Sequence, residues 1–198
     1  MKKIIATIII FISCNLYSDI ISDTAIQFTW LKFLANTMHC SSGVPVLWLG
    51  DSNSFLMNYT YWLETNVCNP SVPGYTTYDI LGIEDNYLVH NPGKAFIMIG
   101  GNNTLEDLTT FTESYRSIML KIKTKGIPIY CVCILNQRST HPDWNAWIAQ
   151  ANIRIQSLCA TYGATYINVP ITDSDLMDSV HLNYTGKMKL VNAVKPYI

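Results

Sequence analysis

Three residues in two distant segments of the chain have the types that a serine nucleophile requires. Ser52 lies in the segment Gly50-Asp51-Ser52, while Asp178 and His181 lie three residues apart near the end of the chain. A serine hydroxyl needs a base that accepts its proton and a carboxylate that holds this base in the right tautomer. We therefore expect Ser52 to act as nucleophile, His181 as base and Asp178 as the residue that orients the base.

Two further residues are candidates for stabilising the oxyanion that forms in such a reaction. Asn102 follows two glycines, which allow the backbone to turn tightly and aim the side-chain amide at the same site. Gly74, in Pro73-Gly74-Tyr75, offers a backbone N–H with no side chain in the way. Together with the N–H of Ser52, they would form an oxyanion hole.

Each of these motifs has a simpler interpretation when taken alone. Ser52 is also typical of a helix N-cap, with Asp51 as a turn former. His181 on its own is more often a surface or core histidine, and Asp178 a carboxylate that caps a loop. The order of the motifs and their positions after predicted strands favour the catalytic interpretation.

The elements that must position these residues alternate along the chain. Continuous apolar runs at residues 44–49, 95–99, 127–135 and 164–169 predict strands buried on both faces. Helical spacing is seen at residues 25–39, 105–125 and 144–162, and Gly126 and Gly163 end the last two. This pattern predicts an α/β fold: a three-layer α/β/α sandwich with a mainly parallel five-stranded sheet, flavodoxin-like. Active sites of such sheets lie at the carboxyl ends of the strands.

Composition limits the function classes further. The chain has 198 residues, of which 49% are hydrophobic and 14% charged, so one packed domain over residues 19–198 is expected. The formal net charge is -1 and the basic residues are scattered, which argues against a nucleic-acid partner. Nothing requires a second chain for folding, and we expect a monomer.

Residues 1–18 have the layout of a leader that directs export. Two lysines precede about ten apolar residues, a stretch too short to span a bilayer permanently. The leader would end either by cleavage near Ser18 or by lipidation of Cys14 in a loose lipoprotein box. We expect an exported protein, secreted, periplasmic or anchored to a bacterial envelope.

The cysteines give no metal site. Six are present, and export with loss of Cys14 would leave five in an oxidising compartment, so that some could pair and at least one would stay free. Cys131 and Cys133 lie two apart on a predicted strand, point the same way, and are expected to pack in the core. No spacing typical of zinc ligands occurs, and no cofactor is expected.

Four segments together resemble the conserved blocks of the SGNH hydrolases, also called the GDSL esterase/lipase family. They are VLWLGDSNS, VPGYTTYDIL, NPGKAFIMIGGNN and DSVHLNYTGK, in family order from residue 44 to the last helix. The resemblance implies a metal-independent serine esterase with Ser52, Asp178 and His181 as triad and Ser52, Gly74 and Asn102 as oxyanion donors. Substrates of such enzymes are carboxylic esters, often acetyl groups on sugars or acyl groups on lipids.

The sequence departs from the family pattern at Asn103, where an aspartate is more common, and Gly82 is an alternative to Gly74 in the glycine block. The absence of Gly-x-Ser-x-Gly around Ser52 argues against an α/β-hydrolase proper. Two other functions use the same features: acyl transfer to a sugar hydroxyl, and non-catalytic glycan binding in the envelope. The segment 136–145, with Arg138, His141 and Trp144, should border the site and is equally well explained as a polar loop.

Overall fold

The computed structural model describes residues 20–137 and 139–198 of the chain, with side chains from residue 29 onward. The expected leader with Cys14, and Arg138, lie outside these residues. The chain divides into two units, Met1–Ala35 and Asn36–Ile198. In the first, the described residues belong to helix α2 (Ile20–Thr37), predicted at residues 25–39. Among the described residues, no helix has the length and apolar character needed to cross a membrane.

The second unit is built on a sheet of five strands in the order β2-β1-β3-β4-β5, and every pairing is parallel. Their bounds are β1 (Val46–Gly50), β2 (Val67–Cys68), β3 (Lys94–Met98), β4 (Ile129–Val132) and β5 (Thr165–Ile167). After β1 the chain adds β2 on one side, and β3 then returns to the other side of β1. The carboxyl ends of β1 and β3 therefore form a topological switch point, where ligands bind in sheets of this kind.

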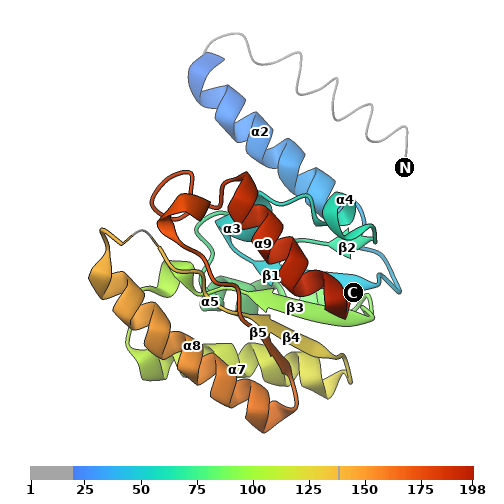
Figure 1. Cartoon of the computed structure of the whole chain (residues 1–198). Coiled ribbons are helices and arrows are strands. Elements are labelled where there is room, and N and C mark those ends of the chain that lie inside the picture. The colour runs from blue at the N-terminus through green and yellow to red at the C-terminus, as the bar shows by residue number, and fades with distance from the viewer. Residues whose placement is uncertain (1–19, 138) are drawn as a thin grey trace. The chain divides into compact units, whose positions relative to one another are not determined.

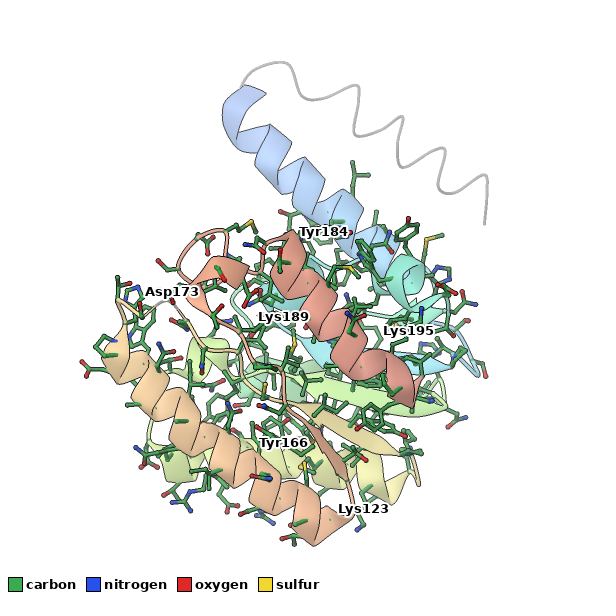
Figure 2. All side chains as sticks on the ribbon, viewed as in Figure 1. Lys123, Tyr166, Asp173, Tyr184, Lys189 and Lys195 are labelled. Carbon is green, nitrogen blue, oxygen red and sulfur yellow. A yellow bond between two sulfur atoms is a disulfide. The ribbon has the colours of Figure 1, made fainter. Side chains whose placement is uncertain are left out.

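Helices cover both faces of this sheet, as Figure 1 shows for α7 and α8 on one side and α9 on the other. Leu47 and Leu49 of β1 pack in the core shared with α7 and α8, while Val46 and Trp48 face the core shared with α9. Tyr166 on β5 (Figure 2) packs against both cores. This confirms the predicted α/β fold, and the observed sheet is wholly parallel.

The helices of this unit are α3 (Ser52–Phe55), α4 (Tyr59–Leu63), α5 (Thr77–Ile83), α6 (Asp85–Leu88), α7 (Leu108–Thr124), α8 (Pro142–Tyr162) and α9 (Tyr184–Val194). Short 3₁₀ turns are η1 (Gly101–Asn103), η2 (Asp173–Asp175) and η3 (Lys195–Tyr197). As predicted, α7 and α8 end at glycines, because Gly126 and Gly163 adopt left-handed φ angles of 71° and 70°.

A disulfide joins Cys40, in the segment before β1, to Cys68 of β2. Cys131, Cys133 and Cys159 are free and buried. The expected core role of Cys131 and Cys133 agrees with this, although the two side chains belong to opposite faces of the sheet: Cys131 lies in the α7/α8 core and Cys133 in the α9 core. The prediction that they point the same way is wrong, because β4 ends at Val132 and the ladder alternation does not extend to Cys133.

Candidate active site

Ser52 stands at the turn that leaves β1. Gly50 ends the strand, the Asp51 carboxylate caps α3 by accepting the N–H of Asn53 at 3.1 Å, and Ser52 is the first residue of the helix. Gly50 is required here, because an added Cβ would lie 2.1 Å from Oγ of Ser54 and 2.8 Å from the carbonyl of Met98. The tight approach of β1, β3 and α3 therefore fixes where Ser52 emerges.

Asp178 and His181 lie on a loop that is closed by its own backbone. An antiparallel bridge pairs Leu176 with Leu182, and the N–H of Met177 donates to the carbonyl of His181 at 2.9 Å. Inside the loop, Oδ1 of Asp178 accepts the backbone N–H of Val180 at 2.8 Å and that of His181 at 2.7 Å. The carboxylate thereby fixes the turn that carries the histidine.

Asp175 fastens the base of this loop. Its buried carboxylate accepts the N–H and the hydroxyl of Thr172, both at 2.8 Å, and the ammonium of Lys189 on α9 at 2.7 Å (Figure 2). The pKa of Asp175 is lowered, chiefly by the hydrogen bond from Lys189. The loop is therefore attached to the helix that follows it.

The structure brings Ser52, His181 and Asp178 into one chain of hydrogen bonds. Nε2 of His181 lies 3.0 Å from Oγ of Ser52, and Nδ1 lies 2.7 Å from Oδ2 of Asp178. With Nδ1 protonated toward the carboxylate, Nε2 carries a lone pair directed at the serine hydroxyl. This arrangement can remove a proton from Ser52.

Two carboxyl groups at the site have pKa values that are shifted in opposite directions. For Asp178, desolvation is the largest single effect and raises the pKa, but the hydrogen bonds from the Val180 N–H and from His181 together outweigh it and lower the pKa to about 2. For Asp51, complete burial raises the pKa to about 6, against the opposing effects of the Asn53 N–H and the charge of His181. Asp178 is thus ionised at neutral pH, while Asp51 is a buried acid that ionises at some cost.

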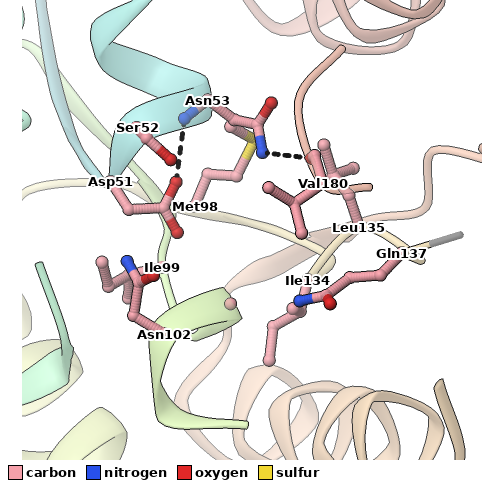
Figure 3. Close-up of a pocket in the computed structure, with 11 residues that line it drawn as sticks. Asp51, Ser52, Asn53, Met98, Ile99, Asn102, Ile134, Leu135, Gln137 and Val180 are labelled. Atoms are coloured by element: carbon pink, nitrogen blue, oxygen red, sulfur yellow. Dashed lines mark hydrogen bonds between the residues drawn. The ribbon is translucent and has the colours of Figure 1, made fainter. Parts of the chain in front are cut away.

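A small pocket lies beside Ser52 (Figure 3). Its lining residues are Asp51, Ser52, Asn53, Met98, Ile99, Gly101, Asn102, Ile134, Leu135, Gln137 and Val180. They come from the carboxyl ends of β1, β3 and β4 and from the histidine loop. Sequence reasoning identified Ser52 and Asn102 among them, and it missed Asn53, whose contacts with the loop leave no mark in the local sequence.

Asn102 is hydrogen-bonded to Tyr75, the residue that follows Gly74. Nδ2 of Asn102 donates to the carbonyl of Tyr75 at 2.8 Å, and its second amide hydrogen remains for another acceptor. Gly74 precedes Tyr75 with a left-handed φ of 84°, and an added Cβ would have no atom within 4 Å. Asn102 lines the pocket with Ser52, whereas Gly74 lies in the adjoining turn outside the set of lining residues. Gly82 lies within α5.

Asn103, where the family more often has aspartate, connects the turn after β3 to α5. Its Oδ1 accepts the N–H of Thr77 at 3.1 Å, and its Nδ2 donates to Oε2 of Glu106 at 2.8 Å and to the Thr77 hydroxyl at 3.1 Å. An aspartate cannot make the donated bonds. The amide therefore suits a site that has a glutamate next to it.

In the described part of the segment 136–145, Gln137 lines the pocket, as expected of a segment that borders the site, while His141, Trp144 and Asn145 make structural contacts. The rings of His141 and Trp144 stack at 4.3 Å, and Asn145 holds both backbone groups of Gln137 at 2.9 Å. In the part of the chain that the structure describes, no group of three or more His, Cys, Asp or Glu side chains could hold a metal ion.

Comparison with known proteins identifies a family to which the sequence belongs. The model of the GDSL-like Lipase/Acylhydrolase family matches residues 49–188, and no curated protein matches the sequence. Three solved structures are similar in fold. A proposed acylhydrolase from Bacteroides fragilis has a TM-score of 0.71 and 15% identity, covering 85% of this chain and 95% of its own.

The second is an acetylxylan esterase from Geobacillus stearothermophilus, with a TM-score of 0.65 and 17% identity over 79% of this chain and 94% of its own. The third is a GDSL-like lipase from Bacteroides thetaiotaomicron, with a TM-score of 0.66 and 16% identity, covering 77% of this chain and 86% of its own. At these identities the likeness concerns the fold. The matched residues 49–188 include the last three blocks of the sequence resemblance and the LGDSNS part of the first.

Proposed function

The chain belongs to the GDSL-like lipase/acylhydrolase family and is a carboxylic ester hydrolase, and from this premise we propose that it acts through Ser52, His181 and Asp178. The observation that carries the proposal is the 3.0 Å separation between Nε2 of His181 and Oγ of Ser52, with Asp178 on the far side of the ring. These distances are within the range required for proton transfer.

In the proposed reaction, Oγ of Ser52 attacks the ester carbonyl carbon while Nε2 of His181 takes the hydroxyl proton. The tetrahedral intermediate collapses as this proton passes to the leaving alcohol, which leaves an acyl-enzyme on Ser52. Water then attacks the acyl carbon with His181 again as base, and the carboxylic acid is released. Asp178, ionised because its pKa is about 2, stabilises the imidazolium that forms in each step.

The oxyanion would be held by the N–H groups of Ser52 and Gly74 and by the amide of Asn102. Support comes from the position of Asn102, which lines the pocket beside Ser52 and has one amide hydrogen left after its bond to Tyr75. Gly74 is placed next to Asn102 in the proposal because the following residue, Tyr75, accepts the hydrogen bond from Asn102. Donors of this kind act by stabilising charge that develops in the transition state.

For the substrate we propose a short acyl group, such as an O-acetyl group on a glycan or a lipid. The pocket volume is about 60 Å³, far below the 300–1,000 Å³ typical of drug-sized ligands, and its walls at Met98, Ile99 and Ile134 are apolar. One protein of similar fold is an acetylxylan esterase, which is consistent with an acetylated glycan.

Export is part of the same proposal. The Cys40–Cys68 disulfide supports an oxidising compartment, in line with the leader expected at residues 1–18. The mature protein would be a monomer that is either released after cleavage near Ser18 or anchored through a lipid on Cys14.

Active-site labelling tests the nucleophile. A fluorophosphonate should modify one serine, and mass spectrometry of the digested protein should place the adduct on Ser52 and find none in Ser52→Ala. An adduct on another serine would refute the assignment. A panel of p-nitrophenyl esters from acetyl to long-chain acyl groups then tests the acyl preference, and we expect kcat/KM to fall as the chain lengthens.

Product analysis separates hydrolysis from transfer. With acetylated xylan as donor and a free sugar as acceptor, we expect acetate as the product. Formation of a new sugar ester in place of acetate would favour the acyltransferase alternative.

A further inference from the structure

Asn53, the residue after the proposed nucleophile, reaches across to the loop that carries His181. Its Nδ2 donates to the carbonyl of Val180 at 3.0 Å, and its Oδ1 accepts the N–H of Leu182 at 3.0 Å. The two bonded backbone groups flank His181 on either side. Figure 3 shows the bond to Val180 together with the bond from the Asn53 backbone N–H to Asp51.

The two kinds of bond at His181 differ in what they connect. The backbone N–H of His181 donates to Asp178 at 2.7 Å, and its carbonyl accepts from Met177 at 2.9 Å. Those bonds lie within the loop and fix its internal shape. The bonds from Asn53 span 127 and 129 residues and connect the loop to the helix that begins with Ser52.

An asparagine side chain suits this position because its amide group carries a donor nitrogen and an acceptor oxygen on the same carbon. The carbonyl of Val180 and the N–H of Leu182 both face the Asn53 side chain, since each forms a hydrogen bond with it. Aspartate has no donor for the carbonyl, and a leucine of similar size has neither group. The amide orientation is fixed by its two partners.

We propose that Asn53 is a positioning residue that sets the distance between Nε2 of His181 and Oγ of Ser52. The inference rests on the proposed function of these two residues. Asn53 itself takes no part in proton transfer. Because it adjoins Ser52 in the chain and holds both neighbours of His181, it ties the nucleophile and the base to one rigid unit, which is the condition for a near-attack geometry.

The test compares Asn53→Leu with Asn58→Ala. The Asn58 side chain caps α4 by accepting the N–H of Tyr61 and contacts none of the proposed catalytic residues. Its replacement by alanine therefore removes a side-chain hydrogen bond without affecting the histidine loop. With p-nitrophenyl acetate, we expect Asn53→Leu to lower kcat by about 10²-fold with KM nearly unchanged, since a misplacement of about 1 Å has that effect. Asn58→Ala should keep the kcat of the wild-type protein.

A second measurement does not depend on activity. The ¹⁵N chemical shift of Nε2 in His181 reports the contact with Ser52, and the low-field proton on Nδ1 reports the bond to Asp178. We expect Asn53→Leu to displace the Nε2 shift in the same direction as Ser52→Ala and to retain the Nδ1 proton, because the Asp178 bond is internal to the loop.

The outcomes separate the two proposals. A wild-type Nε2 shift and a wild-type kcat in Asn53→Leu would overturn the positioning role, as would a loss confined to KM. If the wild-type protein hydrolyses no ester but the Nε2 shift still depends on Asn53, the proposed function fails and the positioning role stands. Loss of the Nδ1 proton in Asn53→Leu would show a general collapse of the loop and would contradict the inference.

Discussion

Oγ of Ser52 and Nε2 of His181 lie 3.0 Å apart, although 129 residues separate the two in the chain. Ser52 is delivered by the end of β1, and His181 by a loop held between η2 and α9. The contact therefore depends on the whole sheet being formed, with β5 and the histidine loop placed beside the switch point. Activity should therefore depend both on the chemistry of these side chains and on the elements that align them.

Replacing Asp178 by Asn should slow the reaction without unfolding the protein. Asn keeps the size of the side chain but cannot favour the imidazolium, and we expect kcat to fall by about 10²- to 10⁴-fold. Because the pKa of Asp178 is about 2, ionisation of this carboxyl should not appear in the wild-type rate profile between pH 4 and 9. Steady-state kinetics across that range checks both points, and an unchanged kcat in the variant would contradict the role.

Asn102→Ala should remove one oxyanion donor and retain the nucleophile and base. Loss of such a donor lowers kcat by about 10²- to 10³-fold. The variant should still react with a fluorophosphonate at Ser52, although more slowly, because the Ser52–His181 pair is intact. A kcat equal to that of the wild-type protein would show that the Asn102 amide does not serve the transition state.

Asp51 should make stability depend on pH. Its pKa is raised by burial to about 6, above the 3.8 of an exposed carboxyl, so the folded state binds a proton more tightly than the unfolded state. The contribution is fully present below about pH 4 and is lost as the pH rises through 6. Asp51→Asn has no such titration.

Urea unfolding of both proteins at pH 4 and pH 7 measures this contribution. Relative to the wild-type protein, the free energy of unfolding of Asp51→Asn should rise by about 3 kcal/mol from pH 4 to pH 7, as an upper value. If the difference in the free energy of unfolding between the two proteins does not change with pH, burial does not raise the pKa of Asp51 and the explanation is wrong.

Restoring the aspartate typical of the family at Asn103 should destabilise this protein. The new carboxylate would face Oε2 of Glu106, where the amide nitrogen now donates at 2.8 Å. We expect Asn103→Asp to lower the free energy of unfolding by about 1–3 kcal/mol through repulsion and the lost hydrogen bond. Glu106→Gln should recover part of the loss in the double variant, and a double-mutant cycle with no coupling between the two positions would refute the explanation.

Much of the fold could be predicted from the sequence, because β1, β3, β4 and β5 are apolar runs flanked by amphipathic helices. Strand β2 could not be located, since Val67–Cys68 is too short to give a pattern. The strand bounds were predicted too long at residues 127–135 because the buried segment after β4 continues beyond the ladder and is held by Asn152 instead, which bonds both backbone groups of Ile134.

The site was only partly predictable. Ser52, Asp178, His181 and Asn102 could be found because their types follow strands in family order. The structure joins the first three by hydrogen bonds and places Asn102 in the pocket that Ser52 lines. The role of Asn53 and the Cys40–Cys68 pairing could not be predicted, because each depends on contacts between residues that are distant in the sequence. Gly74 remains a prediction, since its role depends on the direction of one N–H in a bound complex.

Hydrolysis of p-nitrophenyl acetate by the wild-type chain and by Ser52→Ala tests the central claim most directly. Ser52 is half-buried at the first turn of α3, so its replacement by alanine should leave the thermal midpoint close to that of the wild-type protein. We expect kcat/KM to fall by more than about 10³-fold in the variant, to the level left by binding and the oxyanion hole. Equal rates in the two proteins would contradict the account.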